Sequence, residues 1–357
     1  MGGQKCVAEF YKHLARYTKL ILVASKENKT TLEDGYTVLP FLYNHWQGLR
    51  NVCYLYKLTK LIKEQEIDII ILEHSYFGWL GLIVSWLTKK PVVIRSHNIE
   101  ALRFRDMRRG WWRLYEVYEH WVHKKAAHSF FITEEDKNWA LTHWQLEERK
   151  CTVITYGTVI TTPISIYQKK QSHEELLTTY HLAPGTRLFL FNGSLDYIPN
   201  TDALRIIITE LLPVLQSFPF RYCIFICGKG LDKQWEKLLD AHPEIIYTGF
   251  VKNIDLYFQG ADCFINPVTL GGGIRIKLVE ALAHNQTAIS TRTGARGVPA
   301  GAAGEKLILV EDYDWQAFAK NMVRQDLYIR QDTPPGFYDQ FNWNRIVQKA
   351  RLSLQTL

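Results

Sequence analysis

The sequence has no long hydrophobic run. Its apolar stretches fall well short of the roughly 18 residues that a membrane-spanning helix needs. The first residues, MGGQKCVAEF, do not follow a signal-peptide pattern, so we expect a cytoplasmic protein. The six cysteines are scattered without the spacing of a zinc site or a disulfide framework, and we expect small buried side chains.

Several motifs of catalytic and nucleotide-binding sites are missing too. GxGxxG and GxxxxGK[ST] are both absent, which removes support for an ordinary nicotinamide site or a P-loop. GxSxG, HExxH and a local pair of hydrolytic carboxylates are also absent. A single DxD, Asp312 to Asp314, precedes a helical pattern and is interpreted as a helix N-cap in preference to a magnesium site. We therefore expect no essential metal and no cofactor.

The net charge of +7 is modest, but one segment concentrates it. Residues 101–125, ALRFRDMRRGWWRLYEVYEHWVHKK, place seven arginines and lysines among three tryptophans. Such a segment fits the surface of an anionic membrane or a lipid-linked substrate. A solvated helix whose tryptophans pack inward explains it as well, and the sequence favours this second interpretation slightly. We expect no nucleic-acid partner.

What the chain does contain is two series of buried strands separated by helices. Short β-branched runs predict parallel strands covered on both faces. They occur at 19–25, 67–72, 91–97, 128–133 and 151–155, and again at 187–194, 221–230, 244–251, 263–267, 287–292 and 306–311. A polar stretch, 158–175, predicts a linker between the two series of strands. We expect two Rossmann-like domains that face each other across a cleft, over 1–160 and 176–340.

The first series lacks an element. A Rossmann-like domain normally opens with a central apolar strand that runs into a glycine turn. Here Gly2 and Gly3 and the helical pattern after them come first, and the run at 19–25 is the second strand in order. Either the start of the chain has been placed too late or this domain lacks a central strand.

The segment GGGIRIKLVEALAHN, 271–285, is the strongest candidate for a ligand site. Its glycines follow a strand and open a helix, whose free N–H groups form an anion site. On that helix Lys277, Glu280 and His284 occupy a narrow stripe within an apolar surface. A stripe that lines a ligand cleft is favoured over a buried ion pair.

Two further positions lie at the ends of strands. Gly193 and Ser194 form a second glycine turn, from which a backbone N–H and a hydroxyl are available to a phosphate. Asn200 and Thr201, just beyond it, are suitable N-caps. His97 ends another strand beside Asn98, and a catalytic role and a structural role remain equally open.

The chain resembles the family 4 glycosyltransferases, retaining enzymes of the GT-B fold. The resemblance is carried by RSHNIE (95–100), FNGSLDYIPNTDAL (191–204), YTGFV (247–251), INP (265–267) and GGGIRIKLVEALAHNQTAISTRTGARG (271–297). It implies an enzyme that moves a sugar from a nucleotide-sugar donor to an acceptor without a metal. The resemblance does not identify the acceptor; the basic, aromatic segment 101–125 leads to the hypothesis of a lipid-linked or surface polysaccharide.

The resemblance also assigns residues. Glu280 matches the carboxylate that binds the ribose hydroxyls of the donor, and Gly249, Phe250 and Val251 match the loop that receives the base. The donor sugar and diphosphate are expected to contact Gly193, Ser194, Gly271, Gly272 and Gly273. His97, Lys277 and Arg275 are the expected catalytic residues, and the acceptor side holds Gly2, Gly3 and Asn98. The segment 341–357 is expected to return to the N-terminal domain.

Two departures from the family pattern keep other functions open. Gly272 stands where the family has the first glutamate of E-x7-E, and Ser194 and Pro199 stand where it usually has an arginine and a lysine. Lys277 and Arg275 are the substitutes the chain offers for neutralising the leaving diphosphate. The alternatives are a sugar-nucleotide epimerase of the same fold and a non-catalytic nucleotide-sugar-binding protein.

Overall fold

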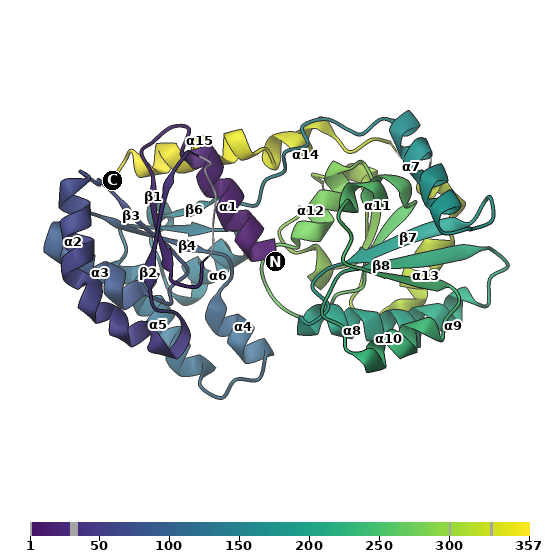
Figure 1. Ribbon diagram of the computed structural model, residues 1–357, viewed down its shortest axis with the longest axis horizontal. Coiled ribbons are helices and arrows are strands. Elements are labelled where there is room, and N and C mark those ends of the chain that lie inside the picture. Colours follow the sequence, from purple (N-terminus) through teal and green to yellow (C-terminus); the bar gives the residue numbers. More distant parts are fainter. Residues whose placement is uncertain (1, 29–34, 300, 329–330) are drawn as a thin grey trace. The chain divides into compact units, whose positions relative to one another are not determined.

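The computed structural model describes residues 2–28, 35–299, 301–328 and 331–357. Its contacts divide the chain into two compact units, which we call the N-terminal unit (2–157, 272–274 and 343–357) and the C-terminal unit (158–271 and 275–342). Both are built from parallel strands and covering helices (Figure 1). No helix in the described ranges is long and apolar enough to cross a membrane.

The C-terminal unit contains one six-stranded parallel sheet in the order β12-β11-β10-β7-β8-β9. Its elements are α7 (Ile166–Thr179), β7 (Arg187–Asn192), α8 (Ile198–Ile206), the π-helical turn η3 (Ile207–Leu211), α9 (Leu212–Leu215), β8 (Tyr222–Cys227), α10 (Lys233–Asp240), β9 (Ile245–Gly249), α11 (Ile254–Gly260), β10 (Cys263–Asn266), α12 (Ile276–Ala283), β11 (Thr287–Thr291), η4 (Thr293–Ala295), η5 (Gly304–Lys306), β12 (Leu307–Val310), α13 (Trp315–Val323), η6 (Gln325–Tyr328) and α14 (Pro335–Gln340). The strand order reverses between β7 and β10, which is where ligands bind in open sheets of this kind.

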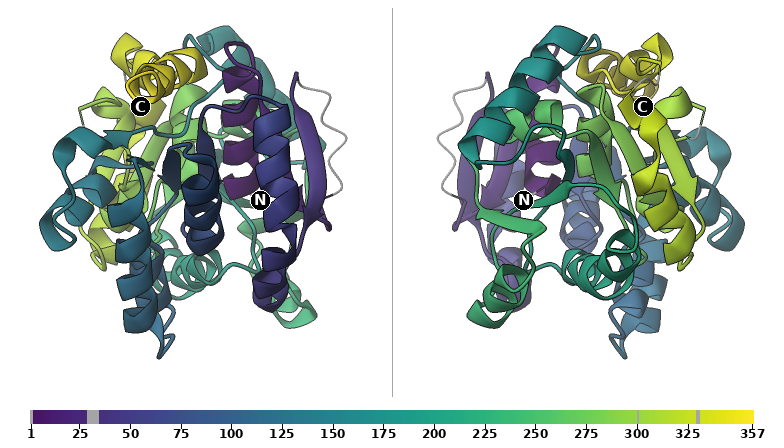
Figure 2. Two further views of the ribbon diagram at one scale, coloured as in Figure 1. Left: turned by 90° about the vertical axis from the view of Figure 1, so that its left-hand side faces the viewer. Right: turned by 90° about the vertical axis from the view of Figure 1, so that its right-hand side faces the viewer.

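The N-terminal unit has two separate parallel sheets, β1-β2 and β3-β4-β5-β6. Its elements are α1 (Gly2–Leu14), β1 (Ile21–Ser25), β2 (Thr37–Leu42), η1 (His45–Tyr54), α2 (Leu55–Glu64), β3 (Ile70–Glu73), α3 (Gly78–Thr88), β4 (Val92–Ser96), α4 (Glu100–Asp106), α5 (Trp112–Lys125), β5 (His128–Phe131), α6 (Glu134–His143), η2 (Glu148–Lys150), β6 (Cys151–Val153) and α15 (Trp343–Leu354). Helix α15, yellow in the pictures, packs against α1, dark purple (Figures 1 and 2).

The core of each unit follows the strand pattern of the sequence. Strands β4, β5, β8, β10 and β11 are almost fully buried, as expected for parallel strands with helices on both faces. All eleven strands expected from the sequence are present. Strand β2 was not predicted from the sequence, because Pro40 interrupts its apolar run. Proline is tolerated there because, among the described residues, β2 pairs with β1 alone and is an edge strand.

The expected linker at 158–175 is wrong in its second half. Residues from Ile166 onward form α7, which packs against α11. Ser165 and Gln168 form a capping box at the start of this helix, in which each side chain satisfies a backbone N–H of the other residue. The polar composition that indicated a linker is the solvated face of a capped helix.

Candidate active site

The candidate donor-binding residues gather in the C-terminal unit at the carboxyl ends of β7, β9 and β10. Gly193 and Ser194 directly follow β7, Gly249 ends β9, and Gly271 follows β10 within the GGG loop. Because β7 and β10 are neighbours at the reversal of strand order, the first and last of these turns lie at the point where a ligand is expected.

Hydrogen bonds between loops hold this edge of the sheet together. The N–H of Gly193 donates to the Cys227 carbonyl at 3.0 Å, and the N–H of Gly228 donates to the Gly249 carbonyl at 2.8 Å. The N–H of Gly193 is thus bonded within the sheet edge, and the expectation that Gly193 and Ser194 supply donors to a phosphate stays a prediction. Gly193 also allows close packing, since a Cβ at this position would lie 2.6 Å from Asn200 Nδ2.

Asn200 and Thr201 do not cap helix α8. The helix begins at Ile198, with Pro199 in its first turn, so both residues already lie inside it. Asn200 instead donates to the Ser194 carbonyl at 2.8 Å and accepts from Lys277 Nζ at 3.0 Å. One amide thus ties the turn after β7 to the helix after β10.

Lys277 lies at the start of α12 in a largely apolar setting. Its ammonium group lies 4.1 Å from the centre of the Phe191 ring and is bonded to Asn200. Burial lowers the pKa of Lys277 well below its usual value, and the nearby charge of Arg275 lowers it further. Because little in these surroundings compensates the charge of the Lys277 ammonium, a phosphate bound beside it would interact with it strongly.

Arg275 has a different environment from the one expected for a phosphate ligand. The residue is buried, and its Nη2 donates to the carbonyls of Leu270 at 2.5 Å and Gly271 at 2.8 Å. These bonds hold the glycine loop in shape, with Gly271 at φ +86° and Gly273 at φ +69°, values that favour glycine. Arg275 therefore positions the loop, and Lys277 is the better candidate for direct contact with a phosphate.

Glu280 lies on α12 one turn beyond Lys277 and is half-buried. His284, the third member of the predicted stripe, is structural. It is buried, its Nε2 lies 3.2 Å from Asp255 Oδ1, and its ring stacks on Phe258 at 5.0 Å between centroids. The predicted ligand-facing stripe is thus wrong at His284, and Lys277 and Glu280 remain its candidates.

The loop after β9 carries an exposed aromatic ring. Gly249 adopts φ +65°, Phe250 is 73% exposed, and Val251 is half-buried. An exposed phenyl ring at the carboxyl edge of a sheet is suited to stack on a nucleobase. The turn after β12 is structural, as expected, since Asp314 caps α13 by accepting from Ala317 N at 3.0 Å.

In the N-terminal unit, His97 directly follows β4 and contacts a buried ion pair that the sequence analysis missed. Its Nε2 lies 2.5 Å from Glu73 Oε2, and Arg95 Nη1 lies 3.1 Å from the other oxygen of the same carboxylate. Arg95 is fully buried, with its guanidinium 4.1 Å from the centre of the Phe10 ring. The sequence did offer a signal, since Glu73 ends one apolar strand and Arg95 lies inside another.

The protonation state of His97 follows from these contacts. Burial lowers the pKa of His97 and Arg95 adds to this effect, although Glu73 opposes it. Burial alone would raise the pKa of Glu73, but Arg95 and His97 hold it well below its usual range. We assign the proton of a neutral His97 to Nε2, because the ionised Glu73 can only accept, and Nδ1 then carries the lone pair.

A second carboxylate, Glu100, organises the residues beside His97. Asn98 Nδ2 donates to Glu100 at 3.1 Å, Arg103 Nε at 2.7 Å and Tyr76 Oη at 2.5 Å. His74, at φ +65°, stacks on His97 at 4.4 Å and lies 3.4 Å from Glu100. Burial alone would raise the pKa of Glu100, but its bond to His74 and the charge of Arg103 lower it to about 2.

The remaining predicted residues are placed as follows. Gly2 and Gly3 are the first residues of α1, and Gly272 and Gly273 group with the N-terminal unit. Among the described residues no three His, Cys, Asp or Glu side chains cluster as a metal site would require. The expectation of a reaction without metal or cofactor stays a prediction.

The two α/β units each carry candidate site residues at the carboxyl edge of a parallel sheet. Residues 186–325 match the model of the Glycosyl transferases group 1, and residues 2–160 match that of the Glycosyltransferase Family 4. The chain therefore belongs to the family 4 glycosyltransferases and is a glycosyltransferase with the GT-B fold. No curated protein matches it in sequence.

Solved structures share the fold along the whole chain. Anabaena Alr3699/HepE in complex with UDP is 17% identical, with a TM-score of 0.76, and the match covers 100% of this chain and 97% of that one. Sucrose-phosphate synthase from Thermosynechococcus elongatus is 15% identical, with a TM-score of 0.72 and coverage of 98% and 92%. The lipopolysaccharide outer core galactosyltransferase WaaB is 12% identical, with a TM-score of 0.66 and coverage of 100% and 96%. The epimerase alternative finds no support among these matches.

Proposed function

We propose that the C-terminal unit binds a nucleoside diphosphate sugar and that the enzyme transfers the sugar with retention of configuration. The observation that carries the proposal is the pairing of Lys277 and Glu280 on one face of α12, directly after a glycine loop at the reversal of strand order. A cation suits the diphosphate, and a carboxylate suits two neighbouring ribose hydroxyls. Alr3699/HepE, whose fold is similar, was crystallised with UDP and with UDP-glucose.

The reaction needs few groups beyond these. The bond between the anomeric carbon and the phosphate oxygen breaks, and the acceptor oxygen bonds to that carbon on the same face. The acceptor hydroxyl gives its proton to the departing diphosphate, so a separate carboxylate base is unnecessary. Lys277 and the N-terminus of α12 neutralise the charge that develops on the diphosphate. On the acceptor side, His97 Nδ1 accepts a hydrogen bond from a sugar hydroxyl.

The test compares two variants of α12 in calorimetry and turnover, with UDP-glucose as the first donor of a panel. Glu280→Ala should weaken nucleotide-sugar binding on the order of 100-fold, because a hydrogen bond to a charged group contributes roughly 1.5–3 kcal/mol. Lys277→Ala should mainly lower kcat, because its charge acts on the leaving group.

Glu174→Ala, at an exposed position on α7, is the matched control and should change neither quantity. Unchanged affinity in Glu280→Ala would overturn the role of that residue. Binding of every donor without transfer or hydrolysis would favour the non-catalytic alternative.

We further propose that the acceptor is lipid-linked and that α5 rests on an anionic membrane. Trp111 and Trp121 are 50% and 43% exposed, so the interpretation in which the tryptophans pack inward is wrong for both. Leu114 and Val117 are 75% and 69% exposed and share one helix face with Trp121. Exposed arginines and lysines flank this apolar face, here called the α5 face, as in helices that lie in a membrane interface.

Sedimentation with vesicles tests this part of the proposal. The protein should bind vesicles that contain phosphatidylglycerol and release them as salt rises, because both charge and apolar contact contribute. The double change Leu114→Ser and Val117→Ser should reduce binding about tenfold or more. Leu352→Ser, at an equally exposed leucine on α15, should not. No binding by the unchanged protein would contradict the membrane proposal and leave the donor site untouched.

A further inference from the structure

Two loops of the N-terminal unit carry the residues around His97. The loop after β3 holds His74, whose ring stacks on that of His97 at 4.4 Å between centroids. The loop after β4 holds His97 and Asn98 and leads into α4. Strands β3 and β4 are parallel neighbours, so their carboxyl ends lie side by side. The position of one loop relative to the other therefore decides how the two imidazole rings meet.

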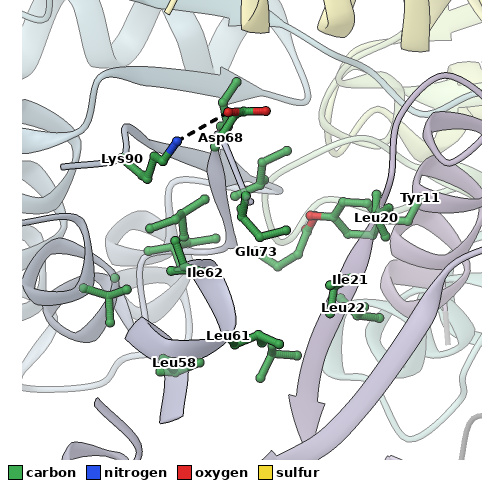
Figure 3. A pocket seen from close by; sticks show the side chains of 18 of the residues that line it. Tyr11, Leu20, Ile21, Leu22, Leu58, Leu61, Ile62, Asp68, Glu73 and Lys90 are labelled. Atoms are coloured by element: carbon green, nitrogen blue, oxygen red, sulfur yellow. Dashed lines mark hydrogen bonds and ion pairs between the residues drawn. The ribbon is translucent and has the colours of Figure 1, made fainter. Parts of the chain in front are cut away.

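Three carboxyl groups lie beside these loops, and their surroundings differ. Glu73 borders a large pocket, where Figure 3 shows it together with Tyr11. Glu73 and Glu100 each form an ion pair with an arginine. Glu119, on α5, is fully buried and is held by two backbone N–H groups and a hydroxyl group. Because such bonds are directional, they fix Glu119 and the groups that bond to it in one arrangement.

Glu119 caps helix α4 from another helix. The first N–H groups of a helix have no partner within it, and a serine, threonine, aspartate or asparagine before the helix usually accepts from them. Ile99 precedes α4, and its side chain has no acceptor atom. The N–H of Glu100 donates instead to Glu119 Oε1 at 3.1 Å, and the N–H of Ala101 donates to Oε2 at 2.9 Å. The carboxyl group of Glu119 thus replaces the missing cap.

The same carboxyl group reaches the loop after β3. Ser75 directly follows His74 and is fully buried. Its Oγ lies 3.2 Å from Glu119 Oε1 and 3.0 Å from the hydroxyl oxygen of Tyr115. Glu119 therefore bonds to the residue next to His74 and to the first turn of the helix that follows His97.

Tyr118 adds a second contact of α5 with the loop after β3. Its hydroxyl group accepts from the N–H of Trp79 at 3.1 Å and donates to the carbonyl of Tyr76 at 3.2 Å. Tyr115, Tyr118 and Glu119 share one face of α5, because they are spaced at one helical turn. Of the hydrogen bonds that these three side chains make within the described residues, those of Glu119 reach both loops.

Glu100 carries this positioning to the residues on the acceptor side. Its backbone N–H is held by Glu119, and its carboxylate accepts from Asn98 Nδ2 at 3.1 Å and lies 3.4 Å from His74 Nδ1. A shift of the first turn of α4 would therefore move the partner of both side chains. Because His97 lies between β4 and that turn, its ring would move as well.

We propose that Glu119 is a positioning residue of the transferase, which fixes His74 and His97 relative to each other. It holds the loop after β3 through Ser75 and the first turn of α4 through the N–H of Glu100. Since it is fully buried, it acts through these groups and not by contact with the substrates. The inference rests on the proposed acceptor-side role of His97, because misplacing a group that meets the substrate lowers turnover.

Glu119→Gln tests the proposal with little change of shape. Burial raises the pKa of Glu119 to about 8, although the N–H groups of Ala101 and Glu100 oppose the rise. The group is therefore largely neutral at pH 7, and the substitution mainly changes hydrogen bonding. An amide has one acceptor oxygen and cannot accept from both N–H groups. The Glu100 or the Ala101 amide should exchange about tenfold faster, and the ring signals of His97 in NMR spectra should shift.

Turnover separates positioning from support of the fold. With UDP-glucose as donor and water as acceptor, Glu119→Gln should lower kcat on the order of tenfold and leave the donor KM unchanged. Glu116→Gln, on the same helix, is the matched control and should change none of these quantities. Ser75→Ala removes only the link to the loop after β3. It should shift the ring signals of His74 and leave the exchange of the Ala101 amide unchanged.

Each outcome decides the inference. Unmoved ring signals of His97 in Glu119→Gln, with or without a loss of activity, would overturn it, and so would unchanged exchange of both amides. If Glu119→Gln does not fold, unmoved ring signals of His74 in Ser75→Ala would overturn it instead. If the unchanged protein hydrolyses no UDP-glucose or other donor of the panel, the proposed function fails, while the ring signals and the amide exchange still decide the role of Glu119.

Discussion

At the scale of single residues, the functional candidates differ in what their neighbours allow them to do. Lys277 keeps its ammonium group beside an aromatic ring and one amide, whereas Arg275 is committed to two loop carbonyls. Neither difference is visible in the sequence, where both are cations after three glycines. His97 was identified by its place at the end of a strand, but its partners Glu73 and Arg95 were hidden in apolar runs.

Glu73 is predicted to act through His97. Its carboxylate fixes the ring and raises the pKa of His97 against the effect of burial. Glu73→Gln should lower kcat on the order of 100-fold through misplacement of the ring, with donor KM unchanged. Because the opposing carboxylate charge is lost, the pKa of His97 falls further, and the acid limb of the kcat profile should move to lower pH.

The matched control is Glu64→Gln, which removes an exposed ion pair with Lys60 on α2. It should leave kcat, KM and the pH profile unchanged, since exposed pairs of this kind contribute little. A loss of activity in Glu73→Gln with an unmoved acid limb would mean that Glu73 only maintains the fold.

At the scale of elements, three loops at the carboxyl ends of β7, β8 and β9 act as one layer. The N–H of Gly193 donates to the Cys227 carbonyl and the N–H of Gly228 donates to the Gly249 carbonyl, so backbone hydrogen bonds link the three loops in series. The sequence predicts each strand and each turn, since periodicity and glycines are local signals. It does not predict the bonds between turns, which depend on strand order.

Gly228→Ala should damage this layer severely. A Cβ at that position would lie 1.9 Å from the Gly193 carbonyl oxygen, a backbone atom that cannot move away cheaply. The expected loss is about 3 kcal/mol or more of unfolding free energy, together with weaker nucleotide-sugar binding. Thermal denaturation and calorimetry measure both.

Gly336→Ala is the control, because a Cβ there meets nothing within 4 Å and the residue lies in the first turn of α14. Alanine is the better helix former, so stability should stay equal or rise by up to about 1 kcal/mol. If the two variants were equally stable, the loops would not be packed as described.

At the scale of the whole molecule, the sequence predicts two α/β domains and nearly all strands, because buried parallel strands have a strong local pattern. What it misses depends on long-range pairing. The edge strand β2 contains Pro40, and helix α7 looks polar because only one of its faces is covered. The exposure of the α5 face could not be predicted from the sequence either, since an amphipathic pattern does not show which tryptophans pack against other side chains.

The stability of the whole chain should fall in acid partly through His123. This buried ring bonds to Ser96 Oγ at 3.0 Å and Ser129 Oγ at 2.8 Å. Burial, aided by His120, lowers its pKa to about 3. Because the unfolded chain binds this proton from pH 6.5 downward and the folded chain does not, stability is present above pH 6.5. It is lost by roughly 1.4 kcal/mol per pH unit down to about pH 3.

His123→Gln should reduce this slope by one proton in urea unfolding curves recorded between pH 6.5 and pH 4. The fluorescence of Trp144, whose ring lies 5.2 Å from His123, contributes to the signal from this part of the N-terminal unit. His143→Gln, an exposed histidine on α6, controls for the loss of one imidazole. Identical slopes for His123→Gln and the unchanged protein would contradict the prediction.

Pro40 in β2 has a consequence for folding in a crowded cell. Thr37 directs its N–H to β1, so by alternation Pro40 occupies an outward-facing position, where its missing N–H breaks no existing bond. A foreign strand approaching that margin meets a position without a donor and cannot extend the ladder there. Newly made chains are thereby protected from edge-to-edge aggregation on this side.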